Sequence, residues 1–128
     1  MKWEGSISFF GTNDLEKTDQ FYKKYFDLDI YKDQGKCKIY KIPGAGMIAF
    51  CEHMEVLTKN KSPIITFLTE NVDEIYDKFN NMDGIELTTH PKKNKKFNIY
   101  QFFAKDPNGY TLEIQKFLDW GWLWWLIF

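Results

Sequence analysis

The stretch DPNGYTLEI, residues 106–114, combines the residues of a tight turn with those of an alternating β-strand. Pro107 fixes φ at the second position of the turn, and Gly109 readily takes the positive φ that ends it. Beyond the turn, the apolar Tyr110, Leu112 and Ile114 alternate with Thr111, Glu113 and Gln115. Because successive side chains of a strand point to opposite faces, we expect the apolar set to face a helix and the Glu113 set to face away from it.

The chain also contains a weak internal repeat. When the sequence is laid over itself so that Phe10 falls on Phe67, Thr12 falls on Thr69 and Leu15 on Val72. Further along, Leu28, Asp29 and Ile30 fall on Ile85, Glu86 and Leu87. Each copy has the order strand, turn, helix, strand, which predicts two related halves.

A helix follows the first strand of each half. Asn13 with Glu16, and Asn71 with Glu74, have the spacing of a capping box with Asn as the cap. The second helix is expected to bury Val72, Ile75, Tyr76, Phe79 and Met82, which recur at helical spacing. The first helix is less regular, with Leu15, Tyr22, Tyr25 and Phe26 along one side.

The remaining apolar runs predict four strands in each half. The expected ranges are 6–12, 28–32, 36–42 and 46–52 in the first half, then 64–69, 85–89, 97–104 and 110–116 in the second. The basic stretch at 90–96 is expected to be a loop. The order predicts an α+β fold of two βαβββ modules, about 5–57 and 62–118, in a single domain 1–118. Their strands would form a curved mixed sheet around a cleft, with the helices on the outer face.

Composition limits the classes of partner. The 128 residues are 44% hydrophobic and carry a formal net charge of −1, so neither a disordered chain nor a nucleic-acid-binding protein is expected. No apolar run reaches the roughly 20 residues of a membrane span. The aromatic tail at 119–128 is interpreted as a docking segment or an added extension. A cytoplasmic location is expected.

Cys37 and Cys51 lack the spacing of a metal motif and are too few for a disulfide framework. In a tight hairpin the two thiols would face each other. We nevertheless interpret them as two small buried hydrophobic residues.

Together, the paired modules, the segment NDLEKTDQFYKKYFDLDI and the closing DPNGYTLEI resemble the vicinal oxygen chelate superfamily of glyoxalases, ring-cleaving dioxygenases and bleomycin-type resistance proteins. The resemblance implies metal ligands on the first and last strands of each module, and a homodimer. The matching positions here are Ile7, Ile64, Ala49 and Glu113. Only Glu113 has a donor atom, so no metal or other cofactor is predicted.

Strand parity predicts an apolar groove for a small organic ligand. Its expected lining is Ile7, Phe9, Ile39, Ala49, Cys51, Ile64, Thr66, Gln101, Phe103 and Glu113. Glu113 is either a solvated or Lys-paired strand residue, or a bare carboxylate that meets the ligand. The first hypothesis is a metal-independent binding protein of the bleomycin-resistance type. The alternatives are a metal-dependent lyase, isomerase or dioxygenase using Glu113 with His53 or His90, and an interaction module that docks through the tail.

Overall fold

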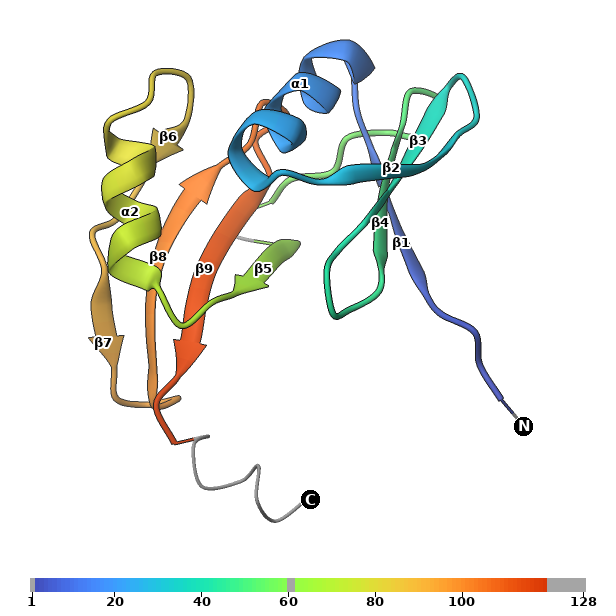
Figure 1. The fold of residues 1–128 in the computed structure, drawn as a ribbon. Helices are drawn as coiled ribbons and strands as arrows, with labels where there is room; N and C mark the ends of the chain where they lie inside the picture. The colour runs from blue at the N-terminus through green and yellow to red at the C-terminus, as the bar shows by residue number, and fades with distance from the viewer. Residues whose placement is uncertain (1, 60–61, 120–128) are drawn as a thin grey trace. The chain divides into compact units, whose positions relative to one another are not determined.

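The computed structural model describes residues 2–59 and 62–119, and the chain divides into two compact units, one up to Thr58 and one from Lys59 onward (Figure 1). The division falls between the predicted modules. The aromatic tail lies outside the described residues, apart from Asp119. Among the helices described, none is both long and apolar enough to cross a membrane.

The first unit contains five strand and helix elements around one mixed sheet. In chain order they are β1 (Ile7–Gly11), α1 (Leu15–Phe26), β2 (Asp29–Asp33), β3 (Cys37–Lys41) and β4 (Met47–Cys51). The sheet order is β1-β4-β3-β2, in which β1 runs parallel to β4 and the other pairs are antiparallel.

The second unit repeats this plan and adds a strand. Its elements are β5 (Ile64–Leu68), α2 (Val72–Asn80), β6 (Glu86–Leu87), β7 (Lys92–Asn94), β8 (Ile99–Lys105) and β9 (Thr111–Phe117). Here β5 runs parallel to β9, and β8 pairs with β9 on one side and with β6 and β7 on the other. The predicted α+β class and paired βαβββ modules are confirmed, and each module forms its own mixed sheet.

The sequence predicted that the basic stretch 90–96 is a loop, but part of it forms a strand. Lys92–Asn94 forms β7, antiparallel to Ile99–Gln101 of β8. The turn between them is closed by Asn94, whose Oδ1 accepts hydrogen bonds from the backbone N–H groups of Lys96 and Phe97. Lysines suit such an edge strand because their charges discourage pairing with another chain.

The start of α1 differs by one residue from the prediction. Asp14, not Asn13, is the N-cap, and its Oδ1 accepts a hydrogen bond of 3.0 Å from the backbone N–H of Lys17. Asn71 is the N-cap of α2, as predicted, although its side chain makes no capping hydrogen bond.

A threonine two residues before each N-cap reproduces the internal repeat in three dimensions. The hydroxyl of Thr12 accepts a hydrogen bond from the N–H of Asp14, and the hydroxyl of Thr69 accepts one from Asn71, both at 3.1 Å. The two units therefore enter their helices through the same local turn.

Each helix covers one face of its own sheet. On α1, Tyr22 stacks on Phe50 of β4 with ring centroids 4.7 Å apart. On α2, Tyr76 meets Phe102 of β8 edge-on, at 5.1 Å. Val72 and Phe79 of α2 are fully buried, whereas Ile75, Tyr76 and Met82, also predicted to be buried, are only partly covered. The cores of both units thus lie between the helix and the sheet.

Cys37 and Cys51 are buried, as predicted, but a disulfide joins them, so their interpretation as two separate hydrophobic side chains was wrong. They are directly opposite each other in the antiparallel register of β3 and β4, with Cα atoms 4.1 Å apart. The adjacent pair, Lys36 and Glu52, is joined by a backbone hydrogen bond from the Glu52 N–H to the Lys36 carbonyl. Because hydrogen-bonded and non-hydrogen-bonded pairs alternate along an antiparallel ladder, the two cysteines form a non-hydrogen-bonded pair, the kind in which side chains are closest.

Candidate functional site

The sheet face opposite α1 carries half of the residues that the sequence suggested for ligand binding. The register places both Phe9 and Ile39 beside Ala49. The members of this apolar face are Ile7, Phe9, Ile39, Ala49 and Cys51, together with Met47, which sequence reasoning missed. Alternation along β1 and β4 could have identified Met47, because it stands two residues before Ala49.

The face opposite α2 carries the other half and contains the polar groups. Glu113 of β9 lies directly between Thr66 of β5 and Phe103 of β8. The predicted members of this polar face are Ile64, Thr66, Gln101, Phe103 and Glu113. Phe102, whose ring contacts α2, marks the opposite side of β8, so Gln101 and Phe103 share the face of Glu113.

Glu113 is a buried carboxylate with one hydrogen bond. Only 8% of the residue is exposed, and its Oε1 accepts a hydrogen bond of 2.7 Å from the Thr66 hydroxyl. Within the described part of the chain, no lysine or histidine lies close enough to form a salt bridge with it. The solvated and Lys-paired alternatives therefore do not describe this side chain, whose remaining lone pairs are available.

Gln101 supplies a second acceptor on the same face. The residue is 5% exposed, and among the described residues its Oε1 is the one buried side-chain nitrogen or oxygen atom without a hydrogen-bond partner. Its cross-strand neighbour Gln115 stands two residues beyond Glu113. A buried acceptor left unpaired costs about 1–3 kcal/mol. A ligand that donates a hydrogen bond there would remove this cost.

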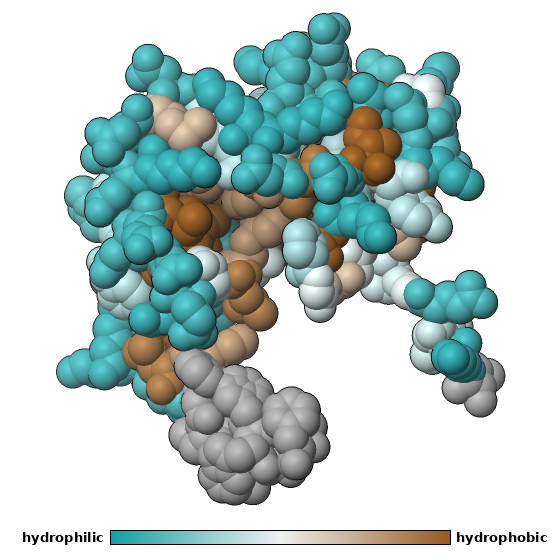
Figure 2. All heavy atoms as spheres, viewed as in Figure 1, coloured by the Kyte–Doolittle hydropathy of each residue, from teal (hydrophilic) through white to brown (hydrophobic). Residues whose placement is uncertain are grey.

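Apolar side chains beside these acceptors remain open. In the second unit, Ile64 and Leu68 are 45% and 64% exposed, on the same strand as Thr66. In Figure 2, brown apolar surface shows between teal polar residues on the side of the molecule that is drawn. Exposed apolar groups beside a few buried polar atoms are typical of a ligand-binding surface.

The metal site implied by the family resemblance is not supported by the residues present. Of its four positions, Ile7, Ile64 and Ala49 have no donor atom, which leaves Glu113 alone. Since a divalent transition metal needs about three protein ligands, this donor set does not fit one.

Neither histidine stands at one of the predicted site positions. His90 is exposed, and its Nδ1 is 2.9 Å from the hydroxyl of Tyr76. His53 follows β4, and its Nδ1 is 3.7 Å from Cys37 Sγ. Among the described residues, neither histidine forms a hydrogen bond or a salt bridge with Glu113.

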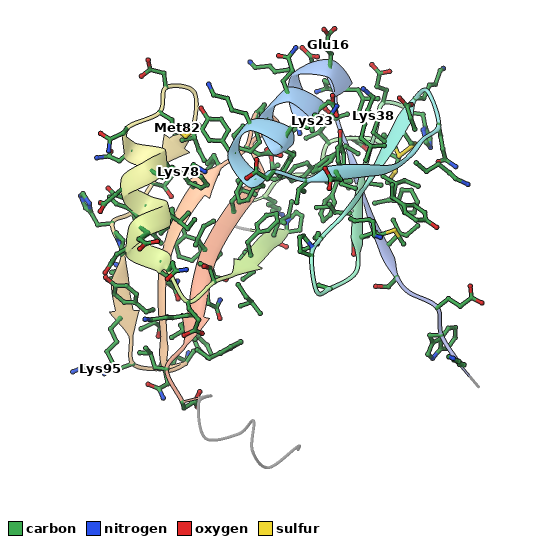
Figure 3. The ribbon with its side chains drawn as sticks, in the orientation of Figure 1. Glu16, Lys23, Lys38, Lys78, Met82 and Lys95 are labelled. Atoms are coloured by element: carbon green, nitrogen blue, oxygen red, sulfur yellow. A yellow bond between two sulfur atoms is a disulfide. The ribbon has the colours of Figure 1, made fainter. Side chains whose placement is uncertain are left out.

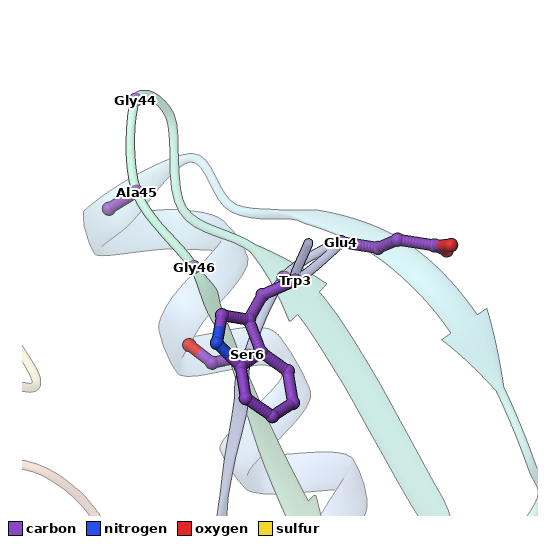
Figure 4. Close-up of a pocket in the computed structure, with 7 residues that line it drawn as sticks. Trp3, Glu4, Ser6, Gly44, Ala45 and Gly46 are labelled. Carbon is purple, nitrogen blue, oxygen red and sulfur yellow. The ribbon is translucent and has the colours of Figure 1, made fainter. Parts of the chain in front are cut away.

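A surface hollow in the first unit is lined by none of the predicted residues. Its lining is Trp3, Glu4, Gly5, Ser6, Gly44, Ala45 and Gly46, where the N-terminal segment runs beside the turn between β3 and β4 (Figure 4). Trp3 is 80% exposed, and none of the residues that line the hollow is buried. We do not assign it a ligand.

A buried polar network stabilises the helix side of the first unit. The Tyr40 hydroxyl donates a 2.5 Å hydrogen bond to Asp19 Oδ1. The Nζ atoms of Lys23 and Lys38, both labelled in Figure 3, lie 2.9 and 3.6 Å from the other carboxylate oxygen of Asp19, Oδ2. Burial alone would raise the pKa of Asp19, but this hydrogen bond and the two ammonium groups hold it below its ordinary value. Burial and the same bond raise the pKa of Tyr40. The network connects α1 to β3 and does not reach the opposite face.

Comparison with known families agrees with this architecture. The family model described as the Glyoxalase/Bleomycin resistance protein/Dioxygenase superfamily matches residues 7–114, from the start of β1 into β9. The chain belongs to this superfamily. No curated protein is significantly similar to it in sequence.

Several solved structures share the fold at low sequence identity. A genomically encoded fosfomycin resistance protein from Listeria monocytogenes has a TM-score of 0.72 at 21% identity, covering 91% of this chain and 94% of that one. A glyoxalase/bleomycin resistance protein/dioxygenase family enzyme from Burkholderia phytofirmans has a TM-score of 0.73 at 19% identity, covering 88% and 98%. A superfamily member from Nocardioides has a TM-score of 0.71 at 17% identity, covering 94% and 87%. These similarities establish the fold. They do not identify a ligand, which has to be inferred from the residues of the site.

Proposed function

We propose that this superfamily member binds a small organic molecule without a metal, as a sequestration protein of the bleomycin-resistance type does. One observation carries the proposal: two buried acceptors, the Glu113 carboxylate and the unpaired Gln101 Oε1, lie on the polar face beside apolar side chains. A filled hydrophobic core would not retain them, because an unpaired buried acceptor is costly.

The chemistry of the face restricts the ligand. Both Glu113 and Gln101 Oε1 accept hydrogen bonds, so the ligand must donate, and a cationic donor such as an amine gains the additional attraction of the carboxylate. Phe103 stands next to Glu113 in the register and offers an aromatic ring, which suits a flat ligand. The ligand class we propose is therefore aromatic amines.

The test measures binding of metal-free bleomycin and a panel of aromatic amines by isothermal titration calorimetry, with fosfomycin, a phosphonate, as the anionic comparison. Glu113→Gln keeps the shape of the side chain and removes its charge. We expect it to weaken amine binding by about 10–100-fold, the loss of one charge-assisted hydrogen bond.

Glu86→Gln is the matched control, because Glu86 is an exposed glutamate on β6 of the same unit. It should leave the affinity unchanged. If no amine of the panel binds, or if the two substitutions weaken binding equally, the proposal fails.

The second candidate is a metal-dependent lyase, isomerase or dioxygenase that uses Glu113. It is favoured by superfamily membership and by the position of Glu113 on the closing strand of its module. Elemental analysis of the purified protein distinguishes the two: stoichiometric metal that is lost on Glu113→Ala would favour the enzyme. We propose no cofactor.

We also propose a homodimer. Its support is the open outer edges of β1 and β5, each hydrogen-bonded to one neighbouring strand among those described, with Ile7, Phe9 and Leu68 exposed on them. Light scattering coupled to size-exclusion chromatography gives the mass directly. The cytoplasmic location stays a prediction.

A further inference from the structure

Apart from the face of Glu113, one group of candidate metal ligands is found among the described residues, and it lies in the first unit. Cys37 Sγ, Cys51 Sγ and a ring nitrogen of His53 lie within 4.8 Å of one another. The two cysteines are buried and His53 is exposed, so the group is open to solvent on the histidine side. None of these atoms belongs to the metal positions implied by the family resemblance.

The distances between these atoms are already close to those between two ligands of the same zinc ion. Zinc bonds to thiolate at about 2.3 Å and to imidazole at about 2.1 Å, so two such ligands at a tetrahedral angle are about 3.6 Å apart. The distance from Cys37 Sγ to His53 Nδ1 is 3.7 Å. Two thiolates at the same angle would be about 3.8 Å apart. Once the disulfide is reduced, the two sulfur atoms therefore need only to move apart to about 3.8 Å to bind one zinc ion.

The sheet, and not the disulfide alone, holds the cysteines together. The β3–β4 ladder continues from Cys37 and Cys51 to Lys41 and Met47, and its register sets the spacing of the cysteine Cα atoms. After reduction the two thiols would stay opposite each other on the same face. The ligands are thus positioned in advance of metal binding.

We propose that Cys37, Cys51 and His53 form a zinc site that is closed by oxidation and opened by reduction. In the oxidised chain the sulfurs bond to each other. A dithiol reductant delivers two electrons and two protons, its own sulfurs become a cyclic disulfide, and Cys37 and Cys51 become free thiols. Zn²⁺ then displaces both thiol protons and binds two thiolates and the imidazole, which leaves a fourth position for water.

The experiment titrates Zn²⁺ into the full chain, competing with a chromogenic chelator, once with the protein oxidised and once after reduction and removal of the dithiol. We expect about one equivalent per reduced chain and none per oxidised chain. Titration with Co²⁺ should give thiolate-to-cobalt charge-transfer absorption and the visible bands of a tetrahedral site. Zinc binding that is absent after reduction, or equal in both states, would overturn the proposal.

His53→Ala identifies the third ligand. Loss of an outer-shell partner already costs about 10–100-fold in metal affinity, so loss of a direct ligand should cost at least about 100-fold. His90→Ala is the matched control, since His90 is the chain's other histidine, is exposed, and is hydrogen-bonded to Tyr76. An affinity that falls equally in both variants, or in neither, rejects His53 as a ligand.

Two further variants keep the result interpretable. Cys37→Ser should abolish tight zinc binding, and circular dichroism of the reduced wild type shows independently whether the sheet persists without the disulfide. Glu113→Gln should leave zinc binding unchanged. Loss of zinc in that variant would instead assign the metal to the family-type position.

Discussion

The two units use one backbone plan for two different surfaces. In the first, the pair that joins the opening and closing strands is Phe9 and Ala49, and in the second the corresponding pair is Thr66 and Glu113. The same threonine turn starts both helices, and both helices cover their sheets with aromatic side chains. The helix side is thus preserved by packing, while the opposite side is free to change its chemistry.

Transferring the carboxylate from one unit to the other should have the largest effect. Ala49 is 0% exposed, and its neighbours Phe9 and Ile39 have no polar side-chain atoms. Ala49→Glu should therefore lower the free energy of unfolding by about 3–5 kcal/mol, the cost of a buried unpaired charge. Urea denaturation measures it.

The double variant Phe9→Thr with Ala49→Glu recreates the hydrogen-bonded pair of the second unit. It should recover about 1.5–3 kcal/mol relative to Ala49→Glu alone, the contribution of a hydrogen bond to a charged group. No recovery would show that the two units differ in more than these two side chains.

A glycine marks a second difference between the units, with an intermediate expected effect. A Cβ at Gly11 would collide with the backbone carbonyl oxygens of Met54 and Glu55, which pass over the end of β1. The residue that the repeat places in register with it, Leu68, is 64% exposed. Gly11→Ala should cost about 2–3 kcal/mol in stability because backbone must shift.

Leu68→Ala should stay within about 0.5 kcal/mol of wild type, as is usual for exposed positions. Thermal and urea unfolding of both variants provide the measurement. Equal costs at the two positions would contradict the difference in crowding between β1 and β5.

A smaller loss of stability than at Ala49 or Gly11 is expected at Asp19, and it depends on pH. Because its pKa in the folded chain lies below the unfolded value of about 3.9, ionised Asp19 stabilises the fold above that value. This contribution is lost as the pH falls through the folded pKa. Asp19→Asn should cost about 1.5 kcal/mol at pH 7, where its hydrogen bond from Tyr40 loses the charge. The difference from wild type should shrink below about pH 4.

The second unit supplies an exposed counterpart for comparison. There the Tyr100 hydroxyl donates a 2.6 Å hydrogen bond to Asp73, and this bond raises the pKa of Tyr100. Asp73→Asn should change stability by less than about 0.5 kcal/mol, because solvent replaces the lost interaction. Urea unfolding across a pH series separates the two variants, and a pH-independent cost at Asp19 would contradict the assigned role of its charge.

Alternation and the internal repeat were sufficient to predict the modules. The period of two in β9 predicted that Glu113 faces away from the helix, and the repeat predicted that Thr66 lines the same groove; the register places the two side by side. These signals are local, and packing of each helix on its sheet enforces them.

The features that sequence reasoning missed depend on contacts between distant segments. β7 lacks an alternating pattern and forms because β8 offers it hydrogen bonds. The disulfide depends on the hairpin register, which a shift of one residue would destroy. The unpaired oxygen of Gln101 is visible only once all of its neighbours are in place. Asn13 and Asp14 are both good caps, so composition alone could not choose between them.

The parallel pairing of β1 with β4, and of β5 with β9, has a consequence for the chain as it is synthesised. Ile7 finds its partner Met47, and Ile64 its partner Thr111, only after nearly a whole module has followed. The antiparallel pairs β2–β3 and β3–β4 are local and can form earlier, since closing a long loop costs more entropy. During synthesis, the apolar opening strand of each module, β1 and then β5, therefore stays unpaired until the rest of its module has emerged. Chaperones bind such exposed apolar segments.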